Sequence, residues 1–331
     1  MKAVPHLLLM PPNWIGDAIM AQPAMAAICA HHMRHCGTER ISLCGRPWLN
    51  DLLPYLALPA STYRESIPKA DAAFLFPGSF RAALQCRLAG IRRLTGYRGQ
   101  WRKLLLNKSL QHRINLKHEH HRNFYLDIAR QCDIEIHRTD VCLSMPETAI
   151  ASAHARMKQS GLNPRKVVCI APGAQFGAAK CYPASAFNII VRQLAESGWQ
   201  PVILGMPEDY EVGQIILHGV SAPCLNMAGT TSFAEALYLI AACRLMLCND
   251  SGLMHVAAGL GIPTVTPFGA TDPQRTSPSG PHVRVLYKPA DCSPCLQREC
   301  TVKGHPCMTN ISPAALLEAC FSMLQAVHTQ P

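Results

Sequence analysis

The stretch RLMLCNDSGLMHVAAGLGIPTVTPFG, residues 244–269, contains the pattern that decides the fold. Its first five residues form a short apolar run typical of a buried strand, and SGLMHVAAGLG then has the apolar spacing of a helix. The run TVTPFG predicts another strand. A strand, a helix and a second strand in this order predict a parallel sheet with a crossover helix.

The same alternation runs through the rest of the second half of the chain. Strands are expected at KVVCIAPG (166–173) and QPVILG (200–205), and helices at ASAFNIIVRQLAES (184–197), SFAEALYLIAAC (232–243) and SPAALLEACFSMLQAV (312–327). Ser232 is the expected N-cap of the 232–243 helix, and Glu235 completes a capping box.

The first half has its own strand-like runs, HLLLM, RISLCG and DAAFLFPG, with helix-like stretches between them. Two such series, joined near residues 145–165, predict an α/β protein of two Rossmann-like, doubly wound domains that face one cleft. We expect domains at 1–160 and 161–311, with a C-terminal helix over 312–331 that packs back toward the first domain.

Composition excludes several classes of protein. The chain has 331 residues, of which 49% are hydrophobic and 16% charged, so it is globular rather than disordered. No apolar run approaches the roughly 20 residues of a membrane helix, and the N-terminal run is too short for a signal peptide. Of the 16 cysteines, Cys29, Cys169, Cys243 and Cys248 lie in apolar runs, as reduced, buried thiols do. We therefore expect a cytoplasmic protein without disulfides.

The net positive charge of the chain comes entirely from its first half. Residues 1–160 contain 21 Lys/Arg and 11 Asp/Glu, whereas residues 161–331 contain 10 of each. Within residues 81–122, eleven basic residues accompany a single acid, Glu119. The segment is either a solvated basic face or a docking surface for an anion, such as nucleic acid, an anionic membrane or a phosphorylated acceptor. Nucleic acid is disfavoured because the segment has only two aromatic residues, Tyr97 and Trp101, to stack on bases.

A carboxylate marks the first strand-to-helix turn. In PPNWIGDAIMAQPAMAAI, residues 11–28, an apolar strand breaks at a Pro-Pro-Asn-Trp turn, and Asp17 follows Gly16. Such turns hold the chemistry of α/β proteins. An acid here would repel a phosphate, so the turn is expected to do something other than hold one.

Two turns of the second half suit an anion. After the strand at 245–248, Asn249 and Asp250 lead into Ser251-Gly252 at a helix start, with His255 one turn later. Free N–H groups and the positive helix end bind anions there; the alternative is that Asp250 or Ser251 serves only as a cap. The loop of APGAQFGAAKCYP, residues 171–183, carries one cation, Lys180, which suits a leaving diphosphate or is simply a surface lysine.

Three further features bear on the ligands. The segment GMPEDYE (205–211) supplies carboxylates where doubly wound folds hold a ribose. The spacing of Cys292, Cys295, Cys300 and Cys307, with His305 nearby, is compatible with a structural metal or with a reduced cluster. The sequence has no P-loop, no G-x-G-x-x-G and no D-x-D pair for a metal-bound nucleotide-sugar.

Five segments together resemble a known family: PPNWIGDAIMAQP, FPGSFRAAL, AGIRRLTGYRGQWRKLLLN, PGAQFGAAKCYP and NDSGLMHVAAGLGIPTV. In this order they resemble the ADP-heptose–lipopolysaccharide heptosyltransferases of glycosyltransferase family 9, most of all the heptosyltransferase II members. The resemblance implies a GT-B architecture and an inverting, metal-independent transfer with no cofactor. It implies that heptose passes from ADP-heptose to an inner-core heptose on a phosphorylated lipid A–Kdo–heptose acceptor.

The resemblance also implies residue roles. Asp17 matches the catalytic aspartate and Lys180 the donor-binding lysine, with Glu211, Asp250, Ser251, Gly252 and His255 as further donor contacts. For the acceptor we expect contacts from the first domain, at Asn13, Trp14, Ser79, Arg81, Arg98 and Arg102. The basic half would also touch the anionic inner leaflet, with the protein a monomer, peripheral on the cytoplasmic face of the inner membrane, that binds no nucleic acid.

Two alternatives stay open at the level of sequence. One is the same fold acting on another acceptor or donor, as heptosyltransferases I and III do. The other is a non-catalytic nucleotide or nucleic-acid binder that uses the basic half.

Overall fold

The computed structural model describes residues 5–37, 40–59, 61–115 and 117–328. The predicted domain limits at residues 1 and 331 lie outside these ranges. The chain divides into two compact units, Met1–Ser144 and Met145–Pro331, and each has its own sheet.

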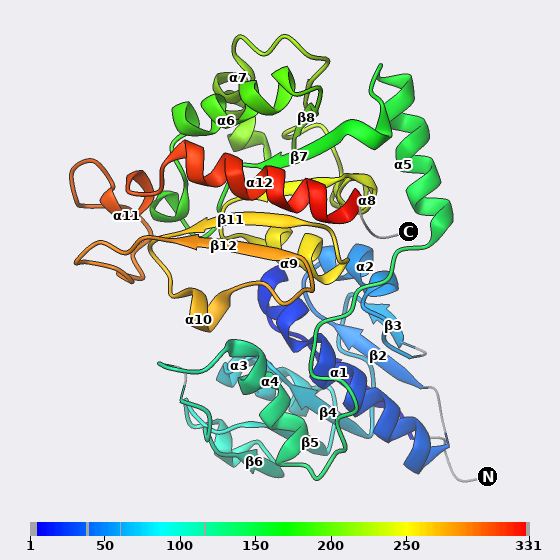
Figure 1. Ribbon diagram of the computed structural model, residues 1–331. Helices are drawn as coiled ribbons and strands as arrows, with labels where there is room; N and C mark the ends of the chain where they lie inside the picture. The colour runs from blue at the N-terminus through cyan, green and yellow to red at the C-terminus, as the bar shows by residue number, and fades with distance from the viewer. Residues whose placement is uncertain (1–4, 38–39, 60, 116, 329–331) are drawn as a thin grey trace. The chain divides into compact units, whose positions relative to one another are not determined.

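The first unit alternates strands and helices along the chain (Figure 1). Its elements are β1 (Leu7–Met10), α1 (Ile15–Cys36), β2 (Ile41–Cys44), α2 (Trp48–Leu52), η1 (Leu53–Tyr55), β3 (Ser61–Arg64), β4 (Ala72–Leu75), α3 (Phe80–Leu88), β5 (Arg93–Tyr97), η2 (Arg102–Leu104), β6 (Lys108–Leu110) and α4 (His121–Arg130).

These strands form one parallel sheet in the order β3-β2-β1-β4-β5-β6. Strand β1 is central, with Leu7 in register with Ile41 on one side and Ala72 on the other. Its leucines are fully buried because a central parallel strand is covered on both faces. The chain builds outward from β1 to β3, and returns to β4 to build the other way. The strand order therefore reverses between β1 and β4.

The second unit repeats this plan with more helices. Its elements are α5 (Glu147–Gln159), η3 (Pro164–Lys166), β7 (Val167–Ala171), η4 (Ala178–Lys180), α6 (Ala184–Glu196), β8 (Gln200–Ile203), η5 (Pro207–Asp209), α7 (Tyr210–Leu217), β9 (Leu225–Asn226), α8 (Phe233–Ala242), β10 (Leu245–Cys248), α9 (Gly252–Gly259), β11 (Thr264–Phe268), α10 (Pro273–Thr276), β12 (Val283–Tyr287), α11 (Pro306–Thr309) and α12 (Pro313–His328).

The second sheet is also parallel, in the order β12-β11-β10-β7-β8-β9. The order reverses between β7 and β10. Helix α12 packs against α6 and the strands β10 to β12, as Figure 1 shows, and brings Leu316 and Cys320 into the core with Phe187 of α6. The C-terminal helix is therefore part of the second unit rather than a separate segment.

The α/β fold of two doubly wound units is confirmed, with two six-stranded parallel sheets and flanking helices. The predicted central strands and helices form, and Ser232 and Glu235 make the predicted capping box at the start of α8. The expected boundary at 160/161 differs from the division at 144/145, because α5 packs on α8 and so lies with the second unit.

The four cysteines that we expected to be buried are buried, at 5% exposure or less, and all four are free thiols. Burial is the first cause that raises the pKa of the Cys248 thiol well above its ordinary value. No described helix combines the length and the apolar character that crossing a membrane would require.

Candidate functional site

Each sheet has one point where the strand order reverses, and doubly wound sheets bind ligands outside the carboxyl ends of the strands at such a point. In the first unit this point lies between the loops that follow β1 and β4, and in the second unit between those that follow β7 and β10. Asp17 follows β1, Lys180 follows β7 and Asp250 follows β10. These three residues therefore lie at the two switch points.

The switch point of the first unit contains a cavity of about 410 Å³ with Asp17 in its wall. The lining comes from the turn after β1, the loops after β4, β5 and β6, and helix α4. The residues are Pro12, Asn13, Trp14, Asp17, Phe76, Pro77, Gly78, Tyr97, Arg98, Gly99, Gln100, His112, Phe124 and Tyr125. An apolar, aromatic wall with a few polar groups is typical of a small-molecule site.

Asp17 is held by helix α4, which packs on α1. It lies in the first turn of α1, where the helix dipole favours a carboxylate, and its Oδ1 is 3.7 Å from Nδ1 of His121. The pKa of Tyr125 is raised well above its ordinary value, first by burial and then by the Asp17 carboxylate and a hydrogen bond to it. Tyr125 is thus a neutral hydroxyl that donates to Asp17.

Aromatic rings form a stack beside this carboxylate. The Tyr97 ring lies 4.3 Å from that of Phe124 and 4.6 Å from that of His112, both nearly parallel. The Tyr97 hydroxyl donates to the Phe124 carbonyl at 2.6 Å and to Asp127. Hydrogen bonds therefore hold the Tyr97 ring in place within the stack.

The predicted acceptor residues fall into two groups. Asn13, Trp14 and Arg98 line the cavity with Asp17. Ser79 instead caps α3, because its hydroxyl accepts from the Ala82 amide at 3.3 Å, and Arg81 is exposed on the same helix.

We expected Arg102 to contact the acceptor, but its side chain is fully buried and cannot meet a ligand at the surface. Its Nη1 donates to the Pro77 carbonyl, while Nε and Nη2 have no hydrogen-bond partner among the described residues. Arg102 holds the Pro77 loop, a wall of the cavity, from behind.

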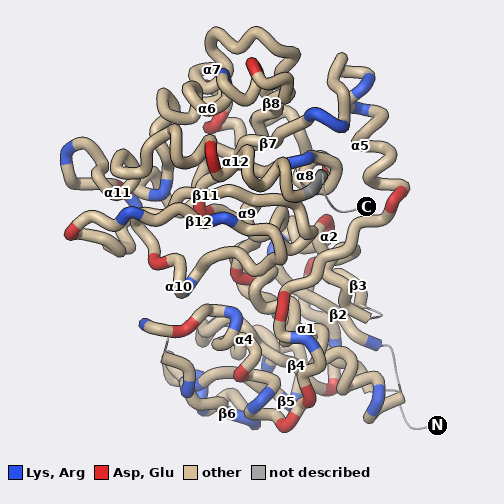
Figure 2. The backbone as a smooth tube through the Cα atoms, in the orientation of Figure 1, with Lys and Arg blue, Asp and Glu red and all other residues tan. Residues whose placement is uncertain are grey.

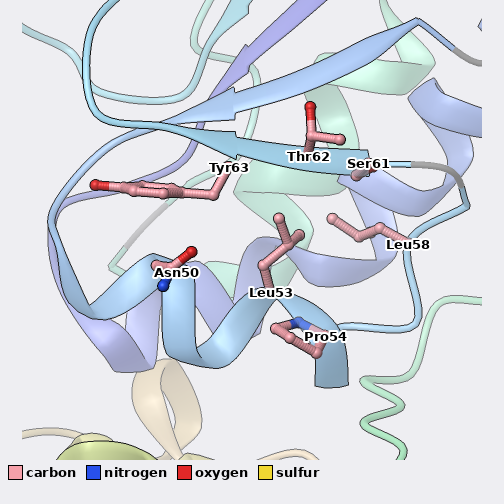
Figure 3. A pocket seen from close by; sticks show the side chains of 7 residues that line it. All are labelled: Asn50, Leu53, Pro54, Leu58, Ser61, Thr62 and Tyr63. Atoms are coloured by element: carbon pink, nitrogen blue, oxygen red, sulfur yellow. The ribbon is translucent and has the colours of Figure 1, made fainter.

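A second hollow of about 610 Å³ lies in the first unit between α2, η1 and β3 (Figure 3). Its seven lining residues include one ionisable side chain, Tyr63, and no carboxylate, imidazole or lysine. Apart from that tyrosine hydroxyl it has no group for acid–base chemistry, so the Asp17 cavity is the better candidate.

The switch point of the second unit has a buried ion pair. Lys180 Nζ lies 2.6 Å from Asp250 Oδ2, and the two side chains are 12% and 4% exposed. The Thr271 hydroxyl donates to the same carboxylate oxygen at 2.5 Å. Lys180 also lies over the Phe176 ring, 4.9 Å from its centroid. An ammonium has three donors, so this pairing fixes the position of Lys180 and leaves other donors for an anion.

The start of α9 completes this site. Ser251 is the N-cap residue, but its hydroxyl makes no cap hydrogen bond and is buried without a partner among the described residues. Buried hydroxyls in native structures normally have partners, so this one suits a bound oxygen. Gly252 begins the helix, and His255 lies buried one turn later. Asn249 anchors the turn, accepting from Tyr182 N and donating to the Pro172 carbonyl.

An acid other than the predicted Glu211 lies against the loop that follows β7. Glu211 is exposed in the first turn of α7. Asp209 instead accepts from Met206 N at 2.8 Å and lies against Gly173 and Gly205, where any Cβ would collide with it. Burial raises the pKa of Asp209 above its ordinary value. Of the three acids that the sequence shows here, Asp209 lies against the loop that follows β7, whereas Glu208 and Glu211 are exposed.

The cysteine-rich segment braces the Lys180 loop. The Arg298 carbonyl accepts from Ala179 N at 2.9 Å, and His305 Nε2 lies 3.0 Å from the Ala179 carbonyl. The Arg298 guanidinium lies over the Phe176 ring, 5.4 Å from its centroid. No pattern in the sequence indicated this role for Arg298.

Cysteines spaced like metal ligands in the sequence do not come together in the structure. They are Cys292, Cys295, Cys300 and Cys307. Among the described residues, which include all four, no three His, Cys, Asp or Glu side chains lie together as metal ligands. Cys292 and Cys300 are exposed, whereas Cys307 is buried against Gly269.

Residues 64–305 match glycosyltransferase family 9 (heptosyltransferase), a span that includes Lys180, Asp250 and the cysteine-rich segment. The chain belongs to glycosyltransferase family 9. It is therefore a glycosyltransferase, as the five sequence segments predicted.

Relatives that match most of this family 9 chain are heptosyltransferases. Lipopolysaccharide heptosyltransferase 2 of Escherichia coli K12 is 30% identical over 96% of this chain and 98% of its own length. Lipooligosaccharide heptosyltransferase 2 of Haemophilus influenzae is 27% identical over 82% of this chain and 86% of its own. The solved E. coli ADP-heptose LPS heptosyltransferase II has a TM-score of 0.80, with 28% identity, and the match covers 98% of this chain and all of that one.

Proposed function

We propose that this glycosyltransferase moves heptose from ADP-heptose to the inner-core heptose of lipopolysaccharide, with inversion at the anomeric carbon and without a metal. The observation that carries the proposal is Asp17, a carboxylate held by Tyr125 in an aromatic cavity at a switch point. The likeness to heptosyltransferase 2 over the full length supports the donor and acceptor.

The first unit supplies the acceptor site and the base. An acceptor hydroxyl that reaches Asp17 gives up its proton as its oxygen attacks the anomeric carbon of the donor. The bond to the diphosphate breaks on the opposite face of that carbon, which inverts its configuration. Asn13, Trp14 and Arg98 line the cavity around the acceptor sugar.

The second unit supplies the donor site. The diphosphate binds at Lys180, the N-terminus of α9 and the free hydroxyl of Ser251, with His255 behind them. These groups stabilise the negative charge that ADP gains as it leaves. Asp250 holds Lys180 in place for this role. For the ribose, Glu211 is the residue implied by the family and Asp209 is the alternative that lies nearer the loop.

The proposal makes Lys180 the cation that meets the leaving group, because the sequence has no D-x-D pair for a metal-bound nucleotide-sugar. Full activity is therefore expected immediately after EDTA is added. Immediate loss that Mg²⁺ or Mn²⁺ restores would contradict this part of the proposal.

The lipid-linked acceptor also bears on where the protein works in the cell. The acceptor is phosphorylated and carries lipid, and the excess positive charge lies in residues 1–160, so we propose that the monomer touches the anionic inner leaflet and binds no nucleic acid.

The direct test uses purified protein, ADP-heptose and lipid A–Kdo acceptors that carry either no heptose or one heptose, with mass spectrometry of the products. The expected result is one added heptose on the mono-heptosylated acceptor only, with its anomeric configuration inverted by NMR. Transfer to the acceptor without heptose would mean heptosyltransferase I activity. No transfer, with a shift on oligonucleotide instead, would replace the enzyme by a nucleic-acid binder.

A further inference from the structure

The first unit exposes a group of large apolar side chains that its cavity does not use. Among the described residues, the three most exposed are Trp101 at 84%, Leu104 at 83% and Leu88 at 79%. Phe80 and Leu84 are exposed as well. We call these five residues the Trp101 patch.

The geometry of two short elements brings the patch together. Phe80, Leu84 and Leu88 are spaced four apart on α3, so they form one stripe, while Ala82, Ala83 and Cys86 face the core. Trp101 precedes the 3₁₀ turn η2 and Leu104 ends it. The Leu104 amide donates to the Trp101 carbonyl at 3.3 Å, and both side chains are exposed.

Hydrogen bonds hold the two elements next to each other. The Gln100 side chain accepts from the Phe80 amide at 3.2 Å, and Arg87 of α3 donates through Nε and Nη2 to the Leu105 carbonyl. The stripe of α3 therefore lies next to η2.

The backbone turns Trp101 outward. Gln100 and Trp101 both have positive φ, 46° and 62°, which is rare for a bulky residue and persists only where the surroundings impose it. The next residue is the fully buried Arg102, whose guanidinium lies against Gly96 and donates to the Pro77 carbonyl. Arg102 anchors the chain on one side of this turn and so keeps Trp101 on the other.

The segment that carries the patch is basic. The sequence has no acid between Asp71 and Glu119. Figure 2 shows Lys and Arg along β5 and β6, and exposed cations lie on or close in sequence to α3 and η2. They are Arg81, Arg92, Arg98, Lys103 and Lys108.

We propose that the Trp101 patch docks the protein on an anionic lipid surface, with Trp101 and Leu104 inserted among the headgroups. Tryptophan and leucine beside clustered Lys and Arg are the chemistry of interfacial binding. A protein partner would more often meet a rim of mixed charge. Gln100 lines the Asp17 cavity, so the docked surface adjoins that site. The choice of a membrane rests on the proposed lipid-linked acceptor.

Binding to vesicles tests this directly with the full chain. We would measure sedimentation with vesicles of phosphatidylethanolamine and phosphatidylglycerol (3:1), and with vesicles of phosphatidylcholine. The wild type is expected to bind the former and not the latter. The W101S/L104S variant is expected to bind at least about tenfold more weakly, because the removed side chains no longer leave water. Lys103→Gln is expected to weaken binding about fivefold, the factor that corresponds to about 1 kcal/mol at 25 °C.

The matched control is I189S/I215S, which removes two exposed apolar side chains of the second unit, 49% and 54% exposed. It is expected to bind vesicles as the wild type does. Equal vesicle binding by the wild type and W101S/L104S would overturn the proposal. So would a monomer–dimer equilibrium, seen by sedimentation equilibrium without lipid, that W101S/L104S abolishes.

Transfer to a lipid-free core oligosaccharide separates this proposal from the proposed function. The W101S/L104S variant is expected to keep wild-type transfer to that acceptor while it loses vesicle binding. If the wild type transfers no heptose but vesicle binding still depends on Trp101, the proposed function fails and the docking surface stands. If the variant loses transfer to the lipid-free acceptor and keeps vesicle binding, the patch is part of the acceptor site and the docking proposal fails.

Discussion

The two units place different chemistry at the same point of the same architecture. In the first, a carboxylate lies in the wall of a 410 Å³ cavity among stacked aromatic rings. In the second, the carboxylate Asp250 is 4% exposed and paired with Lys180. The fold fixes where the loops at each switch point meet. The residues in those loops decide which chemistry the site can perform. An open acid suits proton transfer, whereas a fixed cation beside a helix N-terminus suits an anion.

The largest expected effect tests the first half of this comparison. Asp17→Asn removes the base, and kcat is expected to fall at least about a hundredfold. Donor affinity, measured by calorimetry with ADP, should hardly change because the donor groups lie in the second unit.

The matched control for Asp17 is Asp51→Asn. Asp51 is also an acid in the first turn of a helix of the same unit, α2, and does not line the Asp17 cavity. Near-normal turnover of Asp17→Asn would remove Asp17 from the chemistry, and equal losses in both variants would point to helix stability instead.

The next largest effect is expected at Lys180, in the second unit. Lys180→Met removes a charged donor to the diphosphate, worth about 1.5–3 kcal/mol, so ADP affinity is expected to fall about 10- to 150-fold. The acceptor KM should be unchanged. The variant will also unfold more easily, because Asp250 is left buried without its cation.

The control for Lys180 lies at the other end of the same strand. Lys166 is exposed just before β7, whereas Lys180 follows that strand. Lys166→Met should therefore leave ADP binding intact. If Lys180→Met changed the acceptor KM and spared ADP binding, the roles of the two units would be reversed.

The sequence located the loops of both sites but not their contacts. Asp17, Lys180 and Asp250 could be predicted because each follows an apolar run typical of a strand. Tyr125 and Thr271 could not, since they reach Asp17 and Asp250 from 108 and 21 residues away. Such contacts depend on how helices and loops pack, which one chain's local pattern does not encode.

Two further differences have similar causes. Strands β5 and β6 were not predicted because their residues, RLTGY and KSL, mix basic and polar residues with few apolar ones. Arg102 was expected at the surface because it stands among basic residues, yet it is fully buried behind Pro77. A run of charge predicts a surface for the segment but not for each side chain.

A third prediction sharpens the first site. Tyr125→Phe removes the hydrogen bond to Asp17 while keeping the ring, so kcat is expected to fall about 2- to 10-fold. Burial and the Asp17 carboxylate raise the pKa of Tyr125, so its hydroxyl stays protonated at any working pH below its ordinary value near 10. Tyr125 should therefore not titrate between pH 6 and 9, and the pH profiles of kcat for the wild type and for Tyr125→Phe should have the same shape in that range.

The stacked ring of Tyr97 offers the control for Tyr125. Its hydroxyl bonds the Phe124 carbonyl and Asp127 rather than Asp17. Tyr97→Phe should affect stability more than kcat. A larger kcat loss in Tyr97→Phe than in Tyr125→Phe would show that ring packing, not the bond to Asp17, sets the rate.

The smallest expected effect concerns the charge that separates the two units. Arg98 is exposed and lines the Asp17 cavity, so its contact with an acceptor phosphate is in water. Exposed ion pairs contribute about 0.2–1 kcal/mol, so Arg98→Gln is expected to raise the acceptor KM by less than about sixfold. Salt should reduce the difference, since exposed charges are screened beyond about 8–10 Å. Arg165→Gln, which neutralises an exposed arginine of the second unit, should leave the acceptor KM unchanged. If Arg98→Gln raised the acceptor KM more than about tenfold, and the effect persisted at high salt, the bound acceptor would have to bury this arginine. The contact of Arg98 with the acceptor would then be a buried ion pair, like that of Asp250 with Lys180.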